Sequence, residues 1–170
     1  MSENLAILRR YAKDFPFDAE SCAEEMGIVL KRASILSAIE CDFERRGENT
    51  IFVATRLDDM PAHSRRFAIC VGIAHYLLHR DLMWGSFHGD ALFKGFQPTG
   101  RPLSQKHEMQ AQRFAASMLA PKIAIDALRK TASSEAHILD LMMEKLDIPR
   151  RVAEISLAQA EFRKAGKADR

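Results

Sequence analysis

Residues 65–79 read RRFAICVGIAHYLLH, and this stretch predicts the central helix of the fold. Apolar residues recur in it every three or four positions, which is typical of a helix with one buried face, expected at about residues 64–80. That face consists of Phe67, Cys70, Val71, Ala74 and Leu78. Gly72 is unusual in mid-helix, where glycine costs about 1 kcal/mol relative to alanine. His75 is unusual because it lies within the apolar run, although a histidine in such a place is usually a hydrogen-bonded core residue.

Strand-forming segments come before this helix. Residues 28–30 and 50–55 are rich in β-branched and apolar side chains, and residues 41–44 have the pattern of an outer strand that leads into a charged turn. We therefore expect an α+β fold with a small sheet of about three strands, antiparallel or mixed, packed on helices.

Two helices are expected before the first strand. The first covers about residues 3–14 and is ended by Pro16, because proline lacks an amide hydrogen and disfavours helix in the residue before it. Asp18 then suits the N-cap of a second helix, which we expect to end at Gly27.

The second half of the chain is predicted to be helical after one long loop. Residues 81–103 contain four of the eight glycines and are expected to form an irregular loop. Ser104 suits the N-cap of a helix that runs to about Leu119. Three more helices are expected at about residues 122–130, 134–146 and 150–164, of which the last two form a C-terminal pair.

The composition narrows the class of protein. The chain has 170 residues, of which 47% are hydrophobic and 28% charged, which is typical of a globular domain. A net charge of +2 does not indicate a dedicated nucleic-acid-binding protein. The three cysteines (Cys22, Cys41 and Cys70) form no CxxC pair, so we expect small core residues and no zinc cluster. We expect a cytoplasmic protein, because the first residues lack a signal-peptide pattern and the longest apolar run is too short to span a bilayer.

A second informative stretch is residues 107–121, which read HEMQAQRFAASMLAP. Its apolar positions place one helix face on the core: Met109, Ala111, Phe114, Ala115, Met118 and Leu119. Glu108 falls in the first turn of this helix, where the helix dipole favours a carboxylate in any protein.

Together the two stretches are similar to one known family. The order of an Ile-Phe-Val strand, then RRFAI and HYLLH, then Glu-x-x-Ala-x-x-Phe-Ala-Ala-x-x-Leu-x-Pro resembles the ImmA/IrrE family of zinc metallopeptidases over residues 15–121. The resemblance implies a zincin-like domain at residues 1–130, with the C-terminal helix pair at residues 131–170 packed on it.

The chain departs from the family at the positions that carry catalysis. In the family a His-Glu-x-x-His motif holds one zinc through histidines at i and i+4, and its glutamate is the general base. By this resemblance, the first histidine is replaced by Val71 and the glutamate by Gly72, whereas His75 and Glu108 stand at the two remaining ligand positions. A tetrahedral zinc needs three protein ligands and a water, so we expect no bound cofactor and no peptidase activity.

The resemblance also suggests a partner. Members of this family act on helix-turn-helix repressors of phage, mobile elements or stress responses. We therefore expect a metallopeptidase-like regulator that binds such a transcription factor without cleaving it. An extended segment of the partner could add to an exposed sheet edge through main-chain hydrogen bonds.

One alternative keeps an enzyme. His75 and His79 also lie four residues apart, and Glu108, His88 or His107 could complete a rearranged zinc site for a metal-dependent peptidase. Against it, His79 lies at the expected helix end and no acidic residue lies between the two histidines.

A second alternative is DNA binding by the C-terminal helices. The turn at residues 146–149 resembles that of a helix-turn-helix, with Arg150 and Arg151 at the start of the second helix. A packing role is favoured for this helix instead, because Ile155, Leu157 and Ala158 form an apolar stripe.

Overall fold

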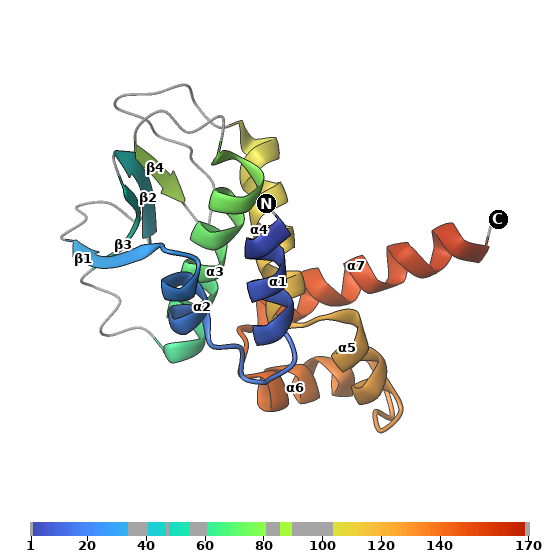
Figure 1. Ribbon diagram of the computed structural model, residues 1–170. Coiled ribbons are helices and arrows are strands. Elements are labelled where there is room, and N and C mark those ends of the chain that lie inside the picture. The colour runs from blue at the N-terminus through green and yellow to red at the C-terminus, as the bar shows by residue number, and fades with distance from the viewer. Residues whose placement is uncertain are drawn as a thin grey trace.

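A computed structural model of the chain describes residues 2–33, 41–46, 48–54, 61–80, 86–89 and 104–168 (Figure 1). All described strands lie in the first 89 residues and only helices are described after them, which gives an α+β fold. In chain order they are α1 (Ser2–Tyr11), α2 (Ala19–Glu25), β1 (Val29–Ala33), β2 (Cys41–Arg46), β3 (Glu48–Ala54), α3 (Ala62–Leu78), β4 (Ser86–Gly89), α4 (Gln105–Leu119), α5 (Lys122–Arg129), α6 (Glu135–Leu146) and α7 (Arg150–Ala168).

The sheet is mixed and has four described strands in the order β1-β3-β2-β4. β1 is parallel to β3, whereas β2 is antiparallel to both β3 and β4. The expectation of about three strands is therefore wrong by one strand. The fourth strand, β4, lies within residues 81–103, which were expected to form an irregular loop. It was not predicted because its four residues are too few to show the alternating pattern of a strand. β4 is stabilised as a strand by its pairing with β2, in which Phe43 is paired with Phe87, and not by its local sequence.

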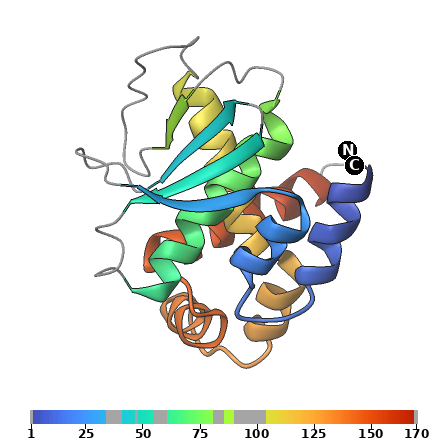
Figure 2. The same ribbon diagram turned by 60° about the vertical axis from the view of Figure 1, so that its left-hand side comes forward.

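Helix α3 lies between the sheet and α4 and is buried on all sides over residues 67–76 (Figure 2). Its contact with β3 depends on Gly72. A Cβ atom at this position would lie 2.7 Å from Cδ1 of Ile51, whose side chain is fully buried. A glycine here thus lets the helix and the sheet approach closely, and this contact compensates for its low helix propensity.

The second N-terminal helix, α2, begins and ends where the sequence predicts, whereas α1 ends at Tyr11, about three residues before the expected end. The Asp18 carboxylate accepts hydrogen bonds from the amide of Ser21 at 3.0 Å and from its hydroxyl at 2.7 Å, and so caps α2. These bonds lower the pKa of Asp18 from its usual value. Gly27 follows α2 with a positive φ of 72°, the left-handed conformation that favours glycine after a helix.

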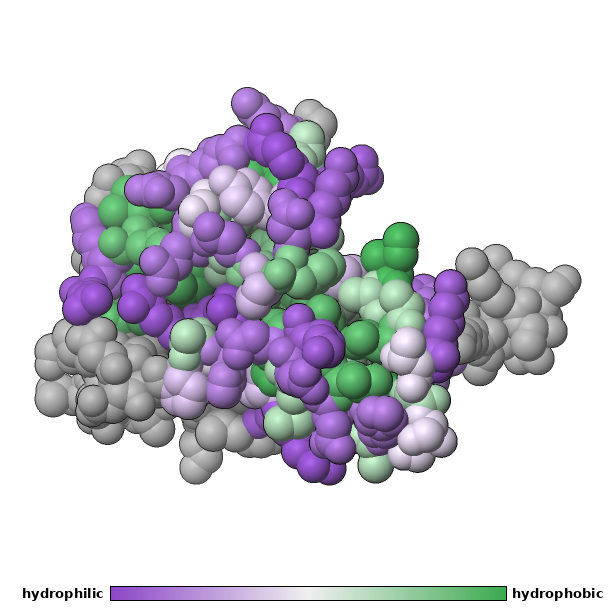
Figure 3. All heavy atoms as spheres, turned by 90° about the horizontal axis from the view of Figure 1, so that it is seen from below, coloured by the Kyte–Doolittle hydropathy of each residue, from purple (hydrophilic) through white to green (hydrophobic). Residues whose placement is uncertain are grey.

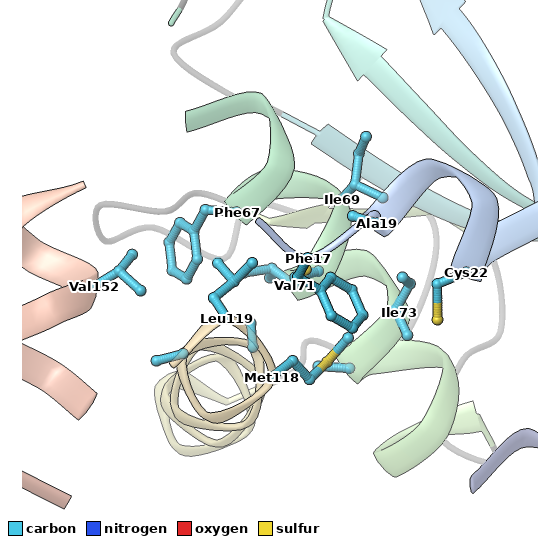
Figure 4. Packing of buried hydrophobic residues seen from close by; sticks show 14 of the residues in the cluster. Phe17, Ala19, Cys22, Phe67, Ile69, Val71, Ile73, Met118, Leu119 and Val152 are labelled. Carbon is cyan, nitrogen blue, oxygen red and sulfur yellow. The ribbon is translucent and has the colours of Figure 1, made fainter. Parts of the chain in front are cut away.

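One hydrophobic core joins the helices to the sheet. Figure 4 shows Val71 of α3 among Phe17 and two residues of α4, Met118 and Leu119, with Val152 of α7 farther away, beyond Phe67 and Leu119. Cys22 and Cys70 are buried free thiols in this core, as expected. Burial raises the pKa of the Cys22 thiol to about 12, so it stays protonated. The side chain of Cys41 lies outside the described residues.

The C-terminal helices are attached to α3 through the turn between them. Asp147 in this turn has a positive φ of 48°. Nη1 of Arg66 donates to its carbonyl oxygen at 2.7 Å and to its Oδ2 at 3.0 Å. The apolar face of α7 differs from the expected stripe, because Val152, Ala153, Leu157 and Ala160 are buried whereas Ala158 is exposed. These buried residues lie on the side of α7 that packs against α4, α5 and α6.

The surface on the side of α5, α6 and α7 is largely hydrophilic, with hydrophobic patches between the charged side chains (Figure 3). None of the helices in the described part of the chain is long and apolar enough to cross a membrane.

Candidate functional site

The most unusual feature of the interior is a chain of polar side chains between α3 and α4. It begins at His75, which is only 2% exposed, one turn after Val71 on the face of α3 toward α4. Nε2 of His75 lies 3.0 Å from Oε2 of Glu108. His75 thus lies buried beside Glu108, as the sequence predicts. The other oxygen of Glu108 accepts a hydrogen bond from Nε2 of Gln112 at 3.3 Å, so both of its oxygens have partners.

His79 extends this chain toward the surface. It follows the last residue of α3, and its amide donates to the carbonyl oxygen of His75 at 2.8 Å. Its side chain lies against α4 and the residue is 4% exposed. Nδ1 of His79 lies 3.1 Å from Nδ1 of His75, and Nε2 lies 3.3 Å from Oε1 of Gln110. We call Glu108, His75, His79 and Gln110 the polar chain. Gln110 was not expected at this site, and the only sign of it in the sequence is its position one helical turn after His107.

The hydrogen atoms available limit how the polar chain is bonded. Suppose that the Gln110 oxygen accepts a hydrogen bond from Nε2 of a neutral His79. Nδ1 of His79 then has no hydrogen and accepts a hydrogen bond from Nδ1 of His75. In this case His75 donates from both ring nitrogens, to His79 and to Glu108. That arrangement holds one imidazolium, at His75. If the Gln110 amide is turned so that its nitrogen donates, both histidines are neutral and all three bonds are still made. The side-chain amide of Gln110 is therefore linked to the proton count of the histidine pair.

Burial disfavours a charge on His79. The pKa of its imidazole is lowered to about 4, first because of desolvation and then because of the neighbouring His75. Since the ordinary value is about 6.5, the His79 side chain is neutral at pH 7. This agrees with an arrangement in which Nδ1 of His79 accepts a hydrogen bond.

His107 lies at the outer end of the polar chain. Its ring centroid is 5.0 Å from that of His79. Nδ1 of His107 accepts a hydrogen bond from the backbone amide of Ser104 at 3.2 Å, which fixes the first turn of α4. The His107 side chain thus helps to cap the N-terminus of α4. The side chain of His88, another expected ligand, lies outside the described residues.

Val71 and Gly72, the positions that the expected resemblance aligns with a ligand and a general base, are part of the core. Val71 is 2% exposed and packs between α3 and α4. Gly72 faces Ile51 on the opposite side of the helix, where no side chain larger than a hydrogen fits without a shift of the isoleucine. A side chain at position 72 would therefore enter the sheet interface and would not reach the polar chain.

The donor set of the polar chain does not fit a zinc ion in this arrangement. His75 presents Nε2 to Glu108 and Nδ1 to His79, and the two nitrogens of an imidazole point away from each other. An ion between His75 and Glu108 would thus lie on the side of the ring away from His79. Nowhere in residues 2–33, 41–46, 48–54, 61–80, 86–89 and 104–168 do three or more His, Cys, Asp or Glu side chains form a group that could hold a metal. A tetrahedral zinc needs three such ligands.

A groove opens at the surface end of the polar chain. It has a volume of about 990 Å³ and lies between the end of α3, the outer side of α4 and the middle of α7. Its lining comprises Leu78, His79, His107, Gln110, Arg113, Phe114, Ser117, Ile155, Ala158, Gln159 and Phe162. Leu78, which the sequence placed on the buried face of its helix, is 45% exposed because α3 ends there at the rim of the groove. We call this hollow the α4–α7 groove.

The arginines expected at a DNA-binding helix are at the start of α7. Arg150 is exposed and its Nε donates to Glu154 at 3.0 Å, one turn further along the same helix. Next to them Val152 and Ala153 are buried in the core. The start of α7 is thus held by packing on one side, which agrees with the favoured packing role.

A scan against models of protein families gave no match to this chain, and a search of curated proteins found no similar sequence.

Proposed function

We propose that this protein is a metallopeptidase-like regulator that binds a transcription factor of the helix-turn-helix class without cleaving it. The proposal rests on the resemblance to the ImmA/IrrE family, and it is supported by the packing of α3 between the sheet and α4. The observation that carries the non-catalytic part is Gly72. The family's general base would stand at this position, and here it faces Ile51 in the core.

The polar chain supports the same proposal. In an active family member His75 and Glu108 would hold zinc together with a second histidine. Here Val71 contributes an apolar side chain to the core, and His75 uses both ring nitrogens for neighbours on α3 and α4. Without a base and a third ligand, an attacking water is not activated.

Two surface features of the described structure could bind a protein partner. One is the open edge of β1, which pairs only with β3 among the described strands. The other is the α4–α7 groove. Either can hold a protein segment, and neither requires catalysis.

The test uses the transcription regulators encoded beside this chain's gene in its host. Each is purified and mixed with the untagged protein in the presence of zinc, and binding is measured by calorimetry and cleavage by mass spectrometry. The proposal predicts a stable complex with at least one regulator, whose mass stays intact. Cleavage of the regulator would show an enzyme, and no binding to any of them would contradict the assigned partner class.

A further inference from the structure

In the described part of the chain, the α4–α7 groove combines exposed apolar side chains with a positive charge that no described carboxylate pairs with. Phe162 is 82% exposed at one rim and Leu78 is 45% exposed at the other. A smaller hollow of about 310 Å³ shares Gln110 and Arg113 with the groove and adds Met109, which is 43% exposed. Three large hydrophobic side chains thus lie open around one continuous surface, which is a feature of protein interaction sites.

The described side chains on this surface carry charge of one sign. Among the described residues that line the two hollows are Lys106 and Arg113, and no Asp or Glu. In the part of the chain that the structure describes, no carboxylate pairs with the guanidinium of Arg113. The nearby acids are engaged elsewhere, since Glu161 accepts from Arg129 at 3.2 Å and Glu108 from His75. A partner that contacts this surface therefore needs acidic side chains beside apolar ones.

The shape favours a helix. The groove runs between two helices, α4 and α7, and none of the described strands lines it. An extended peptide would find no described strand edge to pair with there, whereas a helix satisfies its own main-chain groups and presents apolar side chains at spacings of three and four. On α4 itself, Lys106, Met109, Gln110 and Arg113 follow this spacing and form one exposed row.

From these observations we infer that the α4–α7 groove binds an amphipathic helix of a partner protein, with its apolar row between Leu78 and Phe162 and an acidic residue at Arg113. This inference deepens the proposed function and rests on it for the identity of the partner as a transcription regulator. The chemistry of the contact, an acidic amphipathic helix, comes from the groove alone.

The experiment uses a labelled helical peptide of about 18 residues, roughly five turns, with leucines at spacings of three and four and glutamates beside them. It is titrated against the full chain by fluorescence anisotropy. Saturable binding is expected, and a peptide with lysine in place of each glutamate should bind at least about tenfold more weakly. Arg113→Glu and Phe162→Glu should each weaken binding of the acidic peptide by about tenfold or more.

Ile123→Glu is the matched control. Ile123 is 78% exposed on α5 and does not line the groove, so this variant introduces the same charge at an exposed hydrophobic position. It should leave the affinity within about twofold of the parent. Equal binding of the two peptides, equal loss in the control variant, or no saturable binding would overturn the inference. So would a concentration-dependent dimer that Phe162→Glu abolishes, because a second copy would then cover the groove.

The same variants separate this inference from the proposed function. A regulator that binds the parent, Arg113→Glu and Phe162→Glu equally well would overturn the groove and leave the proposed function intact. An acidic peptide that binds at the groove, with no regulator binding at all, would support the groove and overturn the proposed partner class.

Discussion

His75 contacts His79 through Nδ1 at 3.1 Å and Glu108 through Nε2 at 3.0 Å, so one buried imidazole joins two helices. Both nitrogens of His75 are thus in hydrogen-bond contact in the core between α3 and α4. This relationship gives the polar chain a structural role in the contact between α3 and α4. It also makes the stability of the α3–α4 contact sensitive to substitution and to pH.

His75→Ala should lower the free energy of unfolding by about 1–3 kcal/mol, because it leaves a cavity and removes a hydrogen-bond partner from a largely buried carboxylate. Urea unfolding followed by circular dichroism measures this loss. His75→Ala combined with Glu108→Ala should cost less than the two single losses added together. Additive losses would show that the two side chains do not interact.

His79 should make the protein less stable as the pH falls. Its pKa is lowered to about 4 in the folded state, so below pH 6.5 the unfolded chain binds a proton that the folded chain does not. Stability from this residue is full above pH 6.5 and is lost as the pH falls toward 4. The loss between pH 7 and pH 5 should be about 1–2 kcal/mol.

His79→Gln tests this dependence by urea unfolding at both pH values. The difference between pH 7 and pH 5 should shrink in this variant, whereas His137→Gln, at a partly exposed histidine of α6, should retain the difference of the parent. An unchanged difference in His79→Gln would mean that another group causes the pH dependence.

Gly72→Ala should destabilise the protein by about 1–3 kcal/mol, although alanine favours a helix, because its methyl group would overlap with Ile51. In the background of Ile51→Val, which removes the nearest carbon atom, the same change should cost less. Thermal unfolding of the four proteins of this cycle gives the coupling. A more stable Gly72→Ala in the parent background would mean that α3 and β3 are not in close contact.

Arg66→Ala should cost about 1–2 kcal/mol, because the guanidinium bonds both the carbonyl and the carboxylate of Asp147 in the turn between α6 and α7. Arg150→Ala is the control: its side chain is 64% exposed and its ion pair with Glu154 lies within one helix. Its substitution should change stability by less than about 0.5 kcal/mol. Similar losses in the two variants would contradict a specific role of Arg66.

Much of the helical structure was predictable because local signals mark where the helices begin and end. Asp18 caps α2, Gly27 follows it in the left-handed conformation, and Pro121 comes just after α4. β4 could not be predicted, since its only support is the pairing with β2, a segment about 40 residues earlier in the chain. Strand pairs that are distant in the sequence leave no local pattern when the strand is this short.

The candidate site was predictable in part for a similar reason. The position of His75 on the buried face followed from the helix period, and its contact with Glu108 followed from the family resemblance. The burial of His79 did not, because it depends on α4 covering the end of α3. The four-residue spacing of His75 and His79, which suggested the alternative zinc site, did indicate that the two side chains share a helix face, whereas the only signal for Gln110 was its position one turn after His107.

Native mass spectrometry of the untagged protein, mixed with zinc and with a regulator encoded beside its gene, tests the central claim most directly. The account predicts a complex whose mass is the sum of the two intact chains, with no zinc retained by this chain in one-to-one amount. A zinc-loaded chain together with fragments of the regulator would contradict it.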